Sequence, residues 1–306
     1  MTPLRDLVDE YLALRRALGY TLHRERWLLP RFVSFLETRG QTWITTPLAV
    51  EWASEPGCAT TASAAQRLTM IRGLADYVRA QDPRTEVPSR DLIPIVKQRQ
   101  RPYLYSDAEV QALLAACLRL RSRGVRLTAF TLLGLLAATG LRVGEAVALD
   151  RSDVDPRQGC LLVRHAKFNK SREVPLHATT VEALRVYAEH RDAVHPHPRS
   201  PSFFLTVTGT RPLVQNVWQT FARVRQLAGL SRAPRLPRIH DLRHSFAMST
   251  LLRWSREGLD LQARLPMLST YLGHVGPSST YWYLTATPAL LELAAQRVEP
   301  WRGTQP

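Results

Sequence analysis

The chain has 306 residues, 45% of them hydrophobic, and a formal net charge of +15. This length and apolar content are enough for two domains of ordinary size and exclude a globally disordered protein. A charge this positive favours a polyanionic partner, because Lys and Arg side chains attract phosphates over a long range. The alternative is a basic soluble enzyme whose arginine content is unrelated to its substrate.

The positive charge is concentrated in the C-terminal two-thirds of the chain. Residues 1–100 contain 14 Lys and Arg against 11 Asp and Glu, a net +3, which leaves 27 against 15, a net +12, for residues 101–306. Three of the 41 cations are lysines: Lys97, Lys167 and Lys170. A lysine can give up its proton whereas an arginine essentially cannot. Each of the three lysines is therefore of interest for proton transfer.

Cysteine usage and the apolar segments favour a cytoplasmic location. The three cysteines, Cys58, Cys117 and Cys160, show no CxxC spacing, which suits a reducing compartment and argues against a disulfide framework or structural zinc. The N-terminus lacks the apolar core of a signal peptide. The longest apolar run, residues 127–141, is too short to cross a bilayer and is expected to form a buried core helix.

The N-terminal third is predicted to be a helical domain over residues 1–84. Apolar residues recur at helical spacing in four segments: 4–18, 25–39, a stretch that begins with Thr46 as cap and Pro47 in the first turn, and 62–80. Residues 85–102 then combine prolines with polar side chains, a composition typical of a linker. We place the domain boundary in this linker.

Residues 103–306 are predicted to form a second, mainly helical domain with a small β-sheet. The capping box SDAE at 106–109 begins its first helix. Residues 159–176 alternate apolar and polar positions around a turn at Asn169-Lys170, the pattern of a β-hairpin, and FFLT at 203–206 predicts a short strand. Further helices are expected from a capping box at Thr179–Glu182 and over 213–228, 240–257, 264–272 and 288–297.

The segment ATGLRVGEAVAL contains the first candidate site residue. Thr139-Gly140 is a plausible helix stop, and Arg142 follows at the start of the next helix. An arginine beside a helix N-terminus forms a doubly positive site that suits an anion. The alternative is a surface arginine paired with Glu145, which lies on the same face one turn later.

The segment HDLRHSF supplies a second candidate pair. His240 and Arg243 are spaced i, i+3 and share a helix face, so an imidazole and a guanidinium lie side by side. The alternative is zinc held by His240 and His244, which have i, i+4 spacing. Zincins have Glu directly after the first His, where this chain has Asp241, and the guanidinium would repel a dication. We expect His244 to pack or hydrogen-bond within the fold.

Taken in order, these features resemble the tyrosine recombinases, a family of phage-type integrases and Xer-type recombinases. The resemblance is carried by ATGLRVGEAVAL, a hairpin lysine, HDLRHSF, and LGH followed shortly by a tyrosine, and it covers residues 101–298 by motif. Residues 1–100 match in kind, as the SAM-like helical core-binding domain that precedes the mixed α/β catalytic domain of the family. The implied fold is mainly α with a small β-sheet.

The resemblance also implies the catalytic residues. They are Arg142, Lys167, His240, Arg243, His274 and Tyr283. The family's nucleophile lies nine residues after the histidine of the third motif, which selects Tyr283 over Tyr281. On a helix, side chains two residues apart point about 200° away from each other. If this segment is helical, only one of the two tyrosines would face the site. The chain departs from the family in having Ala166 and Phe168 beside Lys167, where glycines are common.

The function implied by the resemblance is site-specific DNA recombination. The enzyme would cleave and rejoin double-stranded DNA at a specific site through a 3′-phosphotyrosyl intermediate, without cofactor, metal or ATP. It would act as a tetramer on two duplexes, with its C-terminal helix on a neighbouring protomer, and with a possible accessory or partner recombinase. Integration, excision or transposition of a mobile element at the nucleoid is the expected role. The alternatives are a type IB topoisomerase and a non-catalytic DNA-binding regulator.

Overall fold

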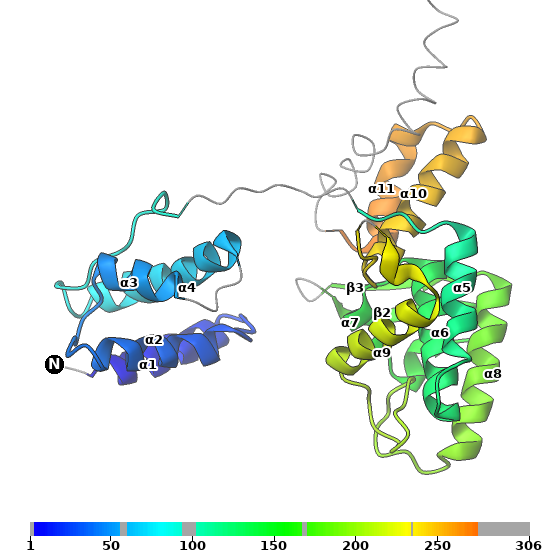
Figure 1. Cartoon of the computed structure of the whole chain (residues 1–306), viewed down its shortest axis with the longest axis horizontal. Helices are drawn as coiled ribbons and strands as arrows, with labels where there is room; N and C mark the ends of the chain where they lie inside the picture. The colour runs from blue at the N-terminus through cyan, green and yellow to red at the C-terminus, as the bar shows by residue number, and fades with distance from the viewer. Residues whose placement is uncertain (1–2, 56–59, 94–101, 167–169, 234, 275–306) are drawn as a thin grey trace, which may run out of the picture. The chain divides into compact units, whose positions relative to one another are not determined.

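The computed structural model describes residues 3–55, 60–93, 102–166, 170–233 and 235–274 (Figure 1). The chain divides into two compact units, residues 1–100 and residues 101–306. The described residues are mainly helical, with a three-stranded sheet in the second unit. This agrees with the predicted fold class.

The first unit is a bundle of helices around an apolar core. Its described helices are α1 (Leu4–Ala17), α2 (Glu25–Glu37), α3 (Thr46–Ala53) and α4 (Thr61–Arg79). Leu29, Phe32 and Ile71 are among its fully buried side chains, and each lies on the apolar face of its helix. The N-cap of α3 is Thr45, one residue before the predicted cap at Thr46, because the helix already includes Thr46.

Part of the segment predicted as a linker packs on the first unit. The amide of Glu86 donates to the carbonyl of Ile44 at 2.8 Å, and Arg72 Nε donates to the carbonyl of Pro88 at 2.7 Å. Val87 also packs against the core of this unit. Residues 85–93 thus extend the first unit, and residues 94–101 lie outside the described residues.

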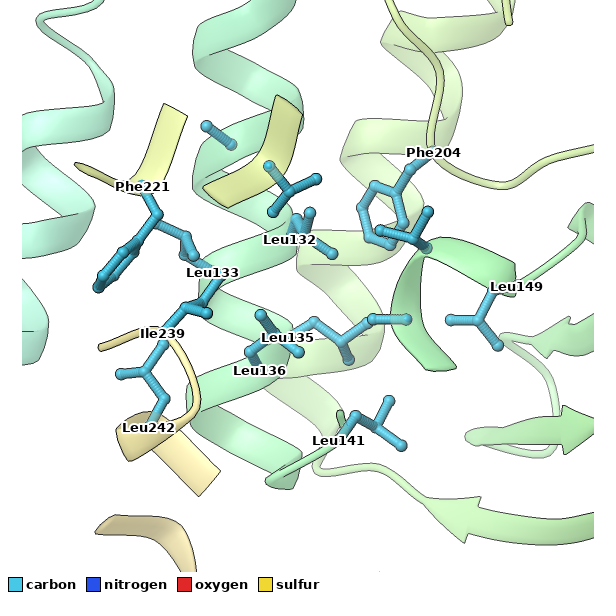
Figure 2. Close-up of a cluster of buried hydrophobic side chains, with 14 of the residues drawn as sticks. Leu132, Leu133, Leu135, Leu136, Leu141, Leu149, Phe204, Phe221, Ile239 and Leu242 are labelled. Atoms are coloured by element: carbon cyan, nitrogen blue, oxygen red, sulfur yellow. The ribbon is translucent and has the colours of Figure 1, made fainter. Parts of the chain in front are cut away.

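The second unit surrounds one central helix. Its described elements are α5 (Asp107–Cys117), α6 (Arg123–Thr139), α7 (Val143–Ala148), β1 (Val154–Asp155), β2 (Cys160–Ala166), β3 (Lys170–Pro175), α8 (Ala178–Val194), α9 (Val214–Leu227), α10 (Asp241–Arg256), α11 (Leu261–Leu272) and the 3-10 helices η1 (Arg151–Asp153) and η3 (Leu230–Arg232). Helix α6 contacts α5, α8, α9 and α10. Figure 2 shows its leucines at the centre of the core, with Phe204, Phe221 and Ile239 around them. The expected core helix at 127–141 is confirmed, and no described helix is long and apolar enough to cross a membrane.

The strands form an antiparallel sheet in the order β1-β2-β3. Leu161 pairs with Val174 and Val163 pairs with Arg172, and the register then shifts between Val163 and Ala166. The predicted hairpin is therefore present, although its residues 167–169 lie outside the described residues. The third strand, β1, has only two residues, too few to show a period of two in the sequence.

Two further local predictions are wrong. The segment 203–206 is not a strand: Ser202 forms an isolated bridge with Asp150, and Phe203 and Phe204 are buried against the core. Their apolar character reflects packing in the core and not pairing in a β-sheet. Helix α8 begins at Ala178, not at a capping box from Thr179, because the ring of His177 accepts a hydrogen bond from the Thr179 amide.

The remaining helix predictions agree with the structure to within a few residues. Helices α9 and α10 match the predicted segments 213–228 and 240–257 to within one residue at each end. Helix α11 begins three residues before the predicted start at 264, because Asp260 caps it and Pro266 is accommodated within the helix. The predicted helix at 288–297 lies outside the described residues.

Replacement of Gly140 by alanine is expected to destabilise the second unit. Gly140 has φ +64°, and an added Cβ would lie 2.7 Å from Phe246 Cδ1 and 3.1 Å from Leu272 Cδ2. Left-handed strain and overpacking together should lower the free energy of unfolding by about 2 to 4 kcal/mol in urea denaturation. Gly144→Ala is the control, since a Cβ there meets nothing within 4 Å. Equal stability of the two variants would contradict the prediction.

Candidate active site

Two left-handed glycine turns bring the candidate residues into one region. Helix α6 ends at Gly140, with φ +64°, and helix α11 ends at Gly273, with φ +67°. A glycine in this conformation reverses the chain directly after the helix and leaves the last carbonyls exposed to other donors. Arg142 follows the first turn and His274 follows the second.

The buried side chain of Arg243 links the two turns. It is 2% exposed. Its Nη1 donates to the Gly140 carbonyl at 2.8 Å, and its Nη2 donates to the Leu272 carbonyl at 2.7 Å. Arg243 therefore joins the ends of α6 and α11 from its position in the first turn of α10.

Arg142 is held from two sides at the start of α7. Its Nη1 donates to Glu145 Oε1 at 2.7 Å, and its Nη2 donates to the Gly273 carbonyl at 3.1 Å. The Arg142 amide also donates to Glu145 Oε2 at 3.0 Å. The Glu145 pairing expected under the alternative interpretation is thus present. The pair is no ordinary surface ion pair, because the Glu145 side chain is only 8% exposed.

Three histidines lie around these arginines. The rings of His240 and His244 meet edge to face, with centroids 4.9 Å apart, so His244 packs within the fold as expected. Partial burial, followed by the positive charge of Arg243, lowers the pKa of His240. Burial, followed by the charges of Arg243 and Arg142, lowers the pKa of His274 to about 4. His240 and His274 are therefore neutral at neutral pH and can accept a proton or hydrogen bond.

The sequence matches known recombinases over the region that contains this site. The model of the phage integrase family matches residues 104–289. A Sinorhizobium fredii (strain NBRC 101917 / NGR234) protein assigned as an integrase/recombinase, y4rB, is 41% identical over 98% of this chain and 98% of its own length. The tyrosine recombinase XerC of Herpetosiphon aurantiacus is 31% identical over 89% of this chain and 87% of its own length. The chain belongs to the phage integrase family.

The fold agrees with this membership. The site-specific recombinase XerH, bound to its palindromic difH substrate in a post-cleavage complex, aligns with a TM-score of 0.65 and 22% identity. The alignment covers 89% of this chain and 78% of the XerH chain. The protein is thus a tyrosine recombinase, an enzyme of site-specific recombination, as its motifs indicate.

The structure brings four of the six predicted recombinase residues together. Arg142 and His240 are the N-caps of α7 and α10, and Arg243 lies in the first turn of α10. His274 follows Gly273, the residue that ends α11. The two remaining residues, Lys167 and Tyr283, lie outside the described residues. Within the described ranges, no group of three or more His, Cys, Asp or Glu side chains is arranged to hold a metal ion.

Two further charged pairs of the recombinase support the site and were not predicted from the sequence. Asp241 is fully buried and accepts hydrogen bonds from the Arg238 amide at 2.8 Å and from Arg238 Nη2 at 3.0 Å, which fixes the first turn of α10. Arg172 on β3 donates to both carboxylate oxygens of Glu145, the carboxylate that also pairs with Arg142. The spacing of Asp241 three residues after Arg238 could have indicated the first pair. The Arg172 contact joins residues 27 apart and has no local signal.

The site is suited to a phosphate anion. Guanidinium groups donate charge-assisted hydrogen bonds to phosphate oxygens, and neutral imidazoles add a titratable donor or acceptor. Because the two arginines are fixed by carbonyls and by Glu145, their orientation is set before any ligand arrives.

The imidazole of His274 is expected to titrate near pH 4. The ordinary value is 6.5, so from pH 6.5 downward the unfolded chain binds a proton at this position before the folded chain does. The free energy of unfolding should therefore fall as pH drops from 6.5 to about 4. NMR titration of the ring, assigned through its loss in His274→Asn, measures the midpoint. A midpoint near 6.5 would contradict the combined effect of burial and the arginines on this ring.

Proposed function

We propose that this recombinase cleaves and rejoins DNA at a specific site through a covalent 3′-phosphotyrosyl intermediate, without metal or ATP. The observation that supports the proposal most is the convergence of Arg142, Arg243 and the neutral His274 on one cationic region. In-line displacement at a phosphodiester increases the negative charge on its non-bridging oxygens. Two preoriented guanidinium groups can stabilise that charge in place of a metal ion.

The proposed roles account for each predicted residue. Arg142 and Arg243 bind the non-bridging oxygens, and His274 donates a hydrogen bond to one of them. The hydroxyl of Tyr283 attacks phosphorus, and the bond from phosphorus to the 5′-oxygen breaks. A tyrosine hydroxyl has an ordinary pKa near 10 and needs a proton acceptor. His240 is that acceptor or a hydrogen-bond partner, which its lowered pKa supports.

Lys167 is the proposed general acid for the leaving 5′-oxygen. A lysine can transfer a proton to the departing alkoxide, whereas arginine retains its proton at any accessible pH. The phosphotyrosyl bond conserves the energy of the cleaved bond, so attack by a 5′-hydroxyl can reverse the reaction without ATP. Cleavage and rejoining thereby use the same residues.

The proposed substrate is double-stranded DNA with a specific recombination site, and the proposed role is integration, excision or transposition of a mobile element at the nucleoid. A tetramer on two duplexes would align the strands for exchange, with or without an accessory or partner recombinase. An apolar recess of about 300 Å³ between α6 and α9, lined by Leu132, Val217 and Phe221 among others, offers a surface for a neighbour's apolar helix. The segment 288–297 of another protomer, which the sequence predicts to be a helix, is the proposed occupant.

Strand transfer between two duplexes is the direct test. In a nicked duplex from the flanks of the gene, cleavage releases the short fragment between the scissile phosphate and the nick. This fragment carries the free 5′-hydroxyl, so its loss prevents rejoining and traps the covalent protein–DNA complex. We expect trapping in the presence of a chelator and, with intact sites, exchange of labelled arms between duplexes. Relaxation of a plasmid without such a site, in the absence of exchange, would favour a topoisomerase. DNA binding without any covalent complex would favour a non-catalytic regulator.

Tyr283→Phe is expected to bind DNA with unchanged affinity and to form no covalent complex, because it lacks the attacking oxygen. Tyr281→Phe is the matched control, with the same atom removed two residues away, and should continue to cleave. Denaturing gel electrophoresis of the trapped complex and peptide mapping of the adduct measure both outcomes. An adduct on Tyr281 in the Tyr283→Phe protein would overturn the assignment.

Lys167→Ala is expected to slow cleavage of ordinary DNA far more than cleavage of DNA with a 5′-bridging sulfur at the scissile phosphate. The thiolate leaves without a proton, so the substrate should bypass the missing acid. Lys170→Ala is the control, since it removes the neighbouring lysine of the hairpin. Single-turnover rates on both substrates give the comparison, and equal defects on both would exclude Lys167 as the acid.

A further inference from the structure

Arg172 on β3 connects three segments of the active site. Its Nη1 and Nη2 donate to the two Glu145 carboxylate oxygens at 3.2 and 3.0 Å. Its Nε donates to the Tyr271 carbonyl at 2.8 Å. Strand β3 is therefore bound both to α7, whose N-cap is Arg142, and to the end of α11, which precedes His274.

The largely buried carboxylate of Glu145 is bound by two arginines. The side chains of Glu145 and Arg172 are 8% and 10% exposed, whereas that of Arg142 is 31% exposed. Arg172 is thus the more buried partner of the carboxylate and Arg142 the more exposed one. A buried carboxylate that loses one partner keeps its desolvation cost, so the two arginines depend on each other through Glu145.

The turn at Gly273 packs directly on the Arg172 guanidinium. A Cβ at Gly273 would lie 2.6 Å from Arg172 Nη1 and 2.8 Å from its Cζ. The hydroxyl of Tyr271 additionally donates to the Pro175 carbonyl at 3.4 Å, so β3 touches the end of α11 at two points. A side chain at this left-handed position would have to displace the guanidinium, so the turn that precedes His274 and the Arg172 side chain pack against each other.

We propose that Arg172 is a positioning residue of the recombinase active site, which orients Arg142 through Glu145 and fixes the His274 turn through the Tyr271 carbonyl. The inference rests on the proposed function and adds a residue that acts through its neighbours. It also accounts for the place of the hairpin. Arg172 lies five residues after Lys167 and opposite Val163, beside the register shift of β2, so the same side chain ties the lysine-bearing hairpin to the two other segments.

Arg172→Met and Arg172→Lys separate the charge of the side chain from its geometry. Methionine removes the charge and all three hydrogen bonds, so misplacement of Arg142 and His274 should slow single-turnover cleavage by about 100-fold while DNA affinity is unchanged. Lysine restores the charge but cannot donate to Tyr271 and to both Glu145 oxygens at once. Its cleavage rate should therefore remain below that of the wild type.

The pH profile gives a second readout. Hydrogen bonding and charge from Arg172, followed by those from Arg142, hold the pKa of Glu145 below its usual range against the effect of burial, and Arg172 also contributes to the low pKa of His274. Without the Arg172 charge both values rise. The acid limb of the cleavage rate should move to higher pH in Arg172→Met and return toward the wild-type position in Arg172→Lys.

Arg164→Met is the matched control. Arg164 lies on the neighbouring strand β2 and pairs with the buried carboxylate of Asp153, but it has no hydrogen bond to Glu145 or Tyr271. It should lose stability without a change in pH profile. If Arg172→Met cleaves at the wild-type rate, or if its defect matches that of Arg164→Met with an unchanged profile, the positioning role is overturned. Full activity of Arg172→Lys would show that the charge of Arg172 matters but its three hydrogen bonds do not.

A readout independent of cleavage separates this inference from the proposed function. NMR titration of His274 should show a higher midpoint in Arg172→Met and an unchanged one in Arg164→Met. Absence of a covalent complex in the wild-type protein would overturn the proposed function. The His274 titration would still decide whether Arg172 holds the turn, since an unchanged midpoint in Arg172→Met contradicts the contact network.

Discussion

The candidate active site depends on two guanidinium groups that bind the carbonyls at two helix ends, that of Arg243 buried and that of Arg142 partly exposed. The C-terminal end of a helix carries a partial negative charge and unpaired carbonyls, which stabilise a cation placed there. Arg243 donates to the last turn region of both α6 and α11, at Gly140 and Leu272, and Arg142 donates to Gly273. These contacts satisfy arginines that would otherwise be costly to bury, and they fix the guanidinium planes. The glycine at each helix end follows from the same requirement, because the chain must turn away at once to leave those carbonyls accessible.

The arrangement also explains the protonation of the histidines. Burial of the ring, followed by the charges of Arg243, Arg142 and Arg172, lowers the pKa of His274 to about 4. A bound phosphate would reverse this effect, since a negative charge favours the protonated imidazole. Substrate and histidine are thus coupled: the ring is neutral while the site is cationic, and it becomes easier to protonate once a phosphate neutralises the arginines. The same coupling makes acid conditions unfavourable to the folded protein without DNA.

The sequence predicted the parts of the site that lie in short segments. The helix stop at Gly140, the i, i+3 spacing of His240 and Arg243, and the start of the next helix at Arg142 are local, so propensity and spacing located them. Contacts between distant segments were not accessible in this way. Arg172 is one polar residue of an alternating strand until the fold places it against Glu145, 27 residues earlier. Phe203 and Phe204 failed as a strand prediction for the same reason, because burial in the core and burial in a sheet produce the same apolar run.

The balance of charge around Glu145 sets what the site can bind. Arg142, Arg172 and Arg243 contribute three positive charges, and Glu145 removes one, so these four side chains carry a net charge of +2. In the proposed reaction a phosphodiester brings one negative charge and develops more during displacement, so the excess matches the growing charge of the reacting group more closely than that of the resting substrate. Without Glu145 the three guanidinium groups would repel one another when no DNA is bound. One buried carboxylate thus holds Arg142 and Arg172 in place, and Arg172 is the more buried of its two partners.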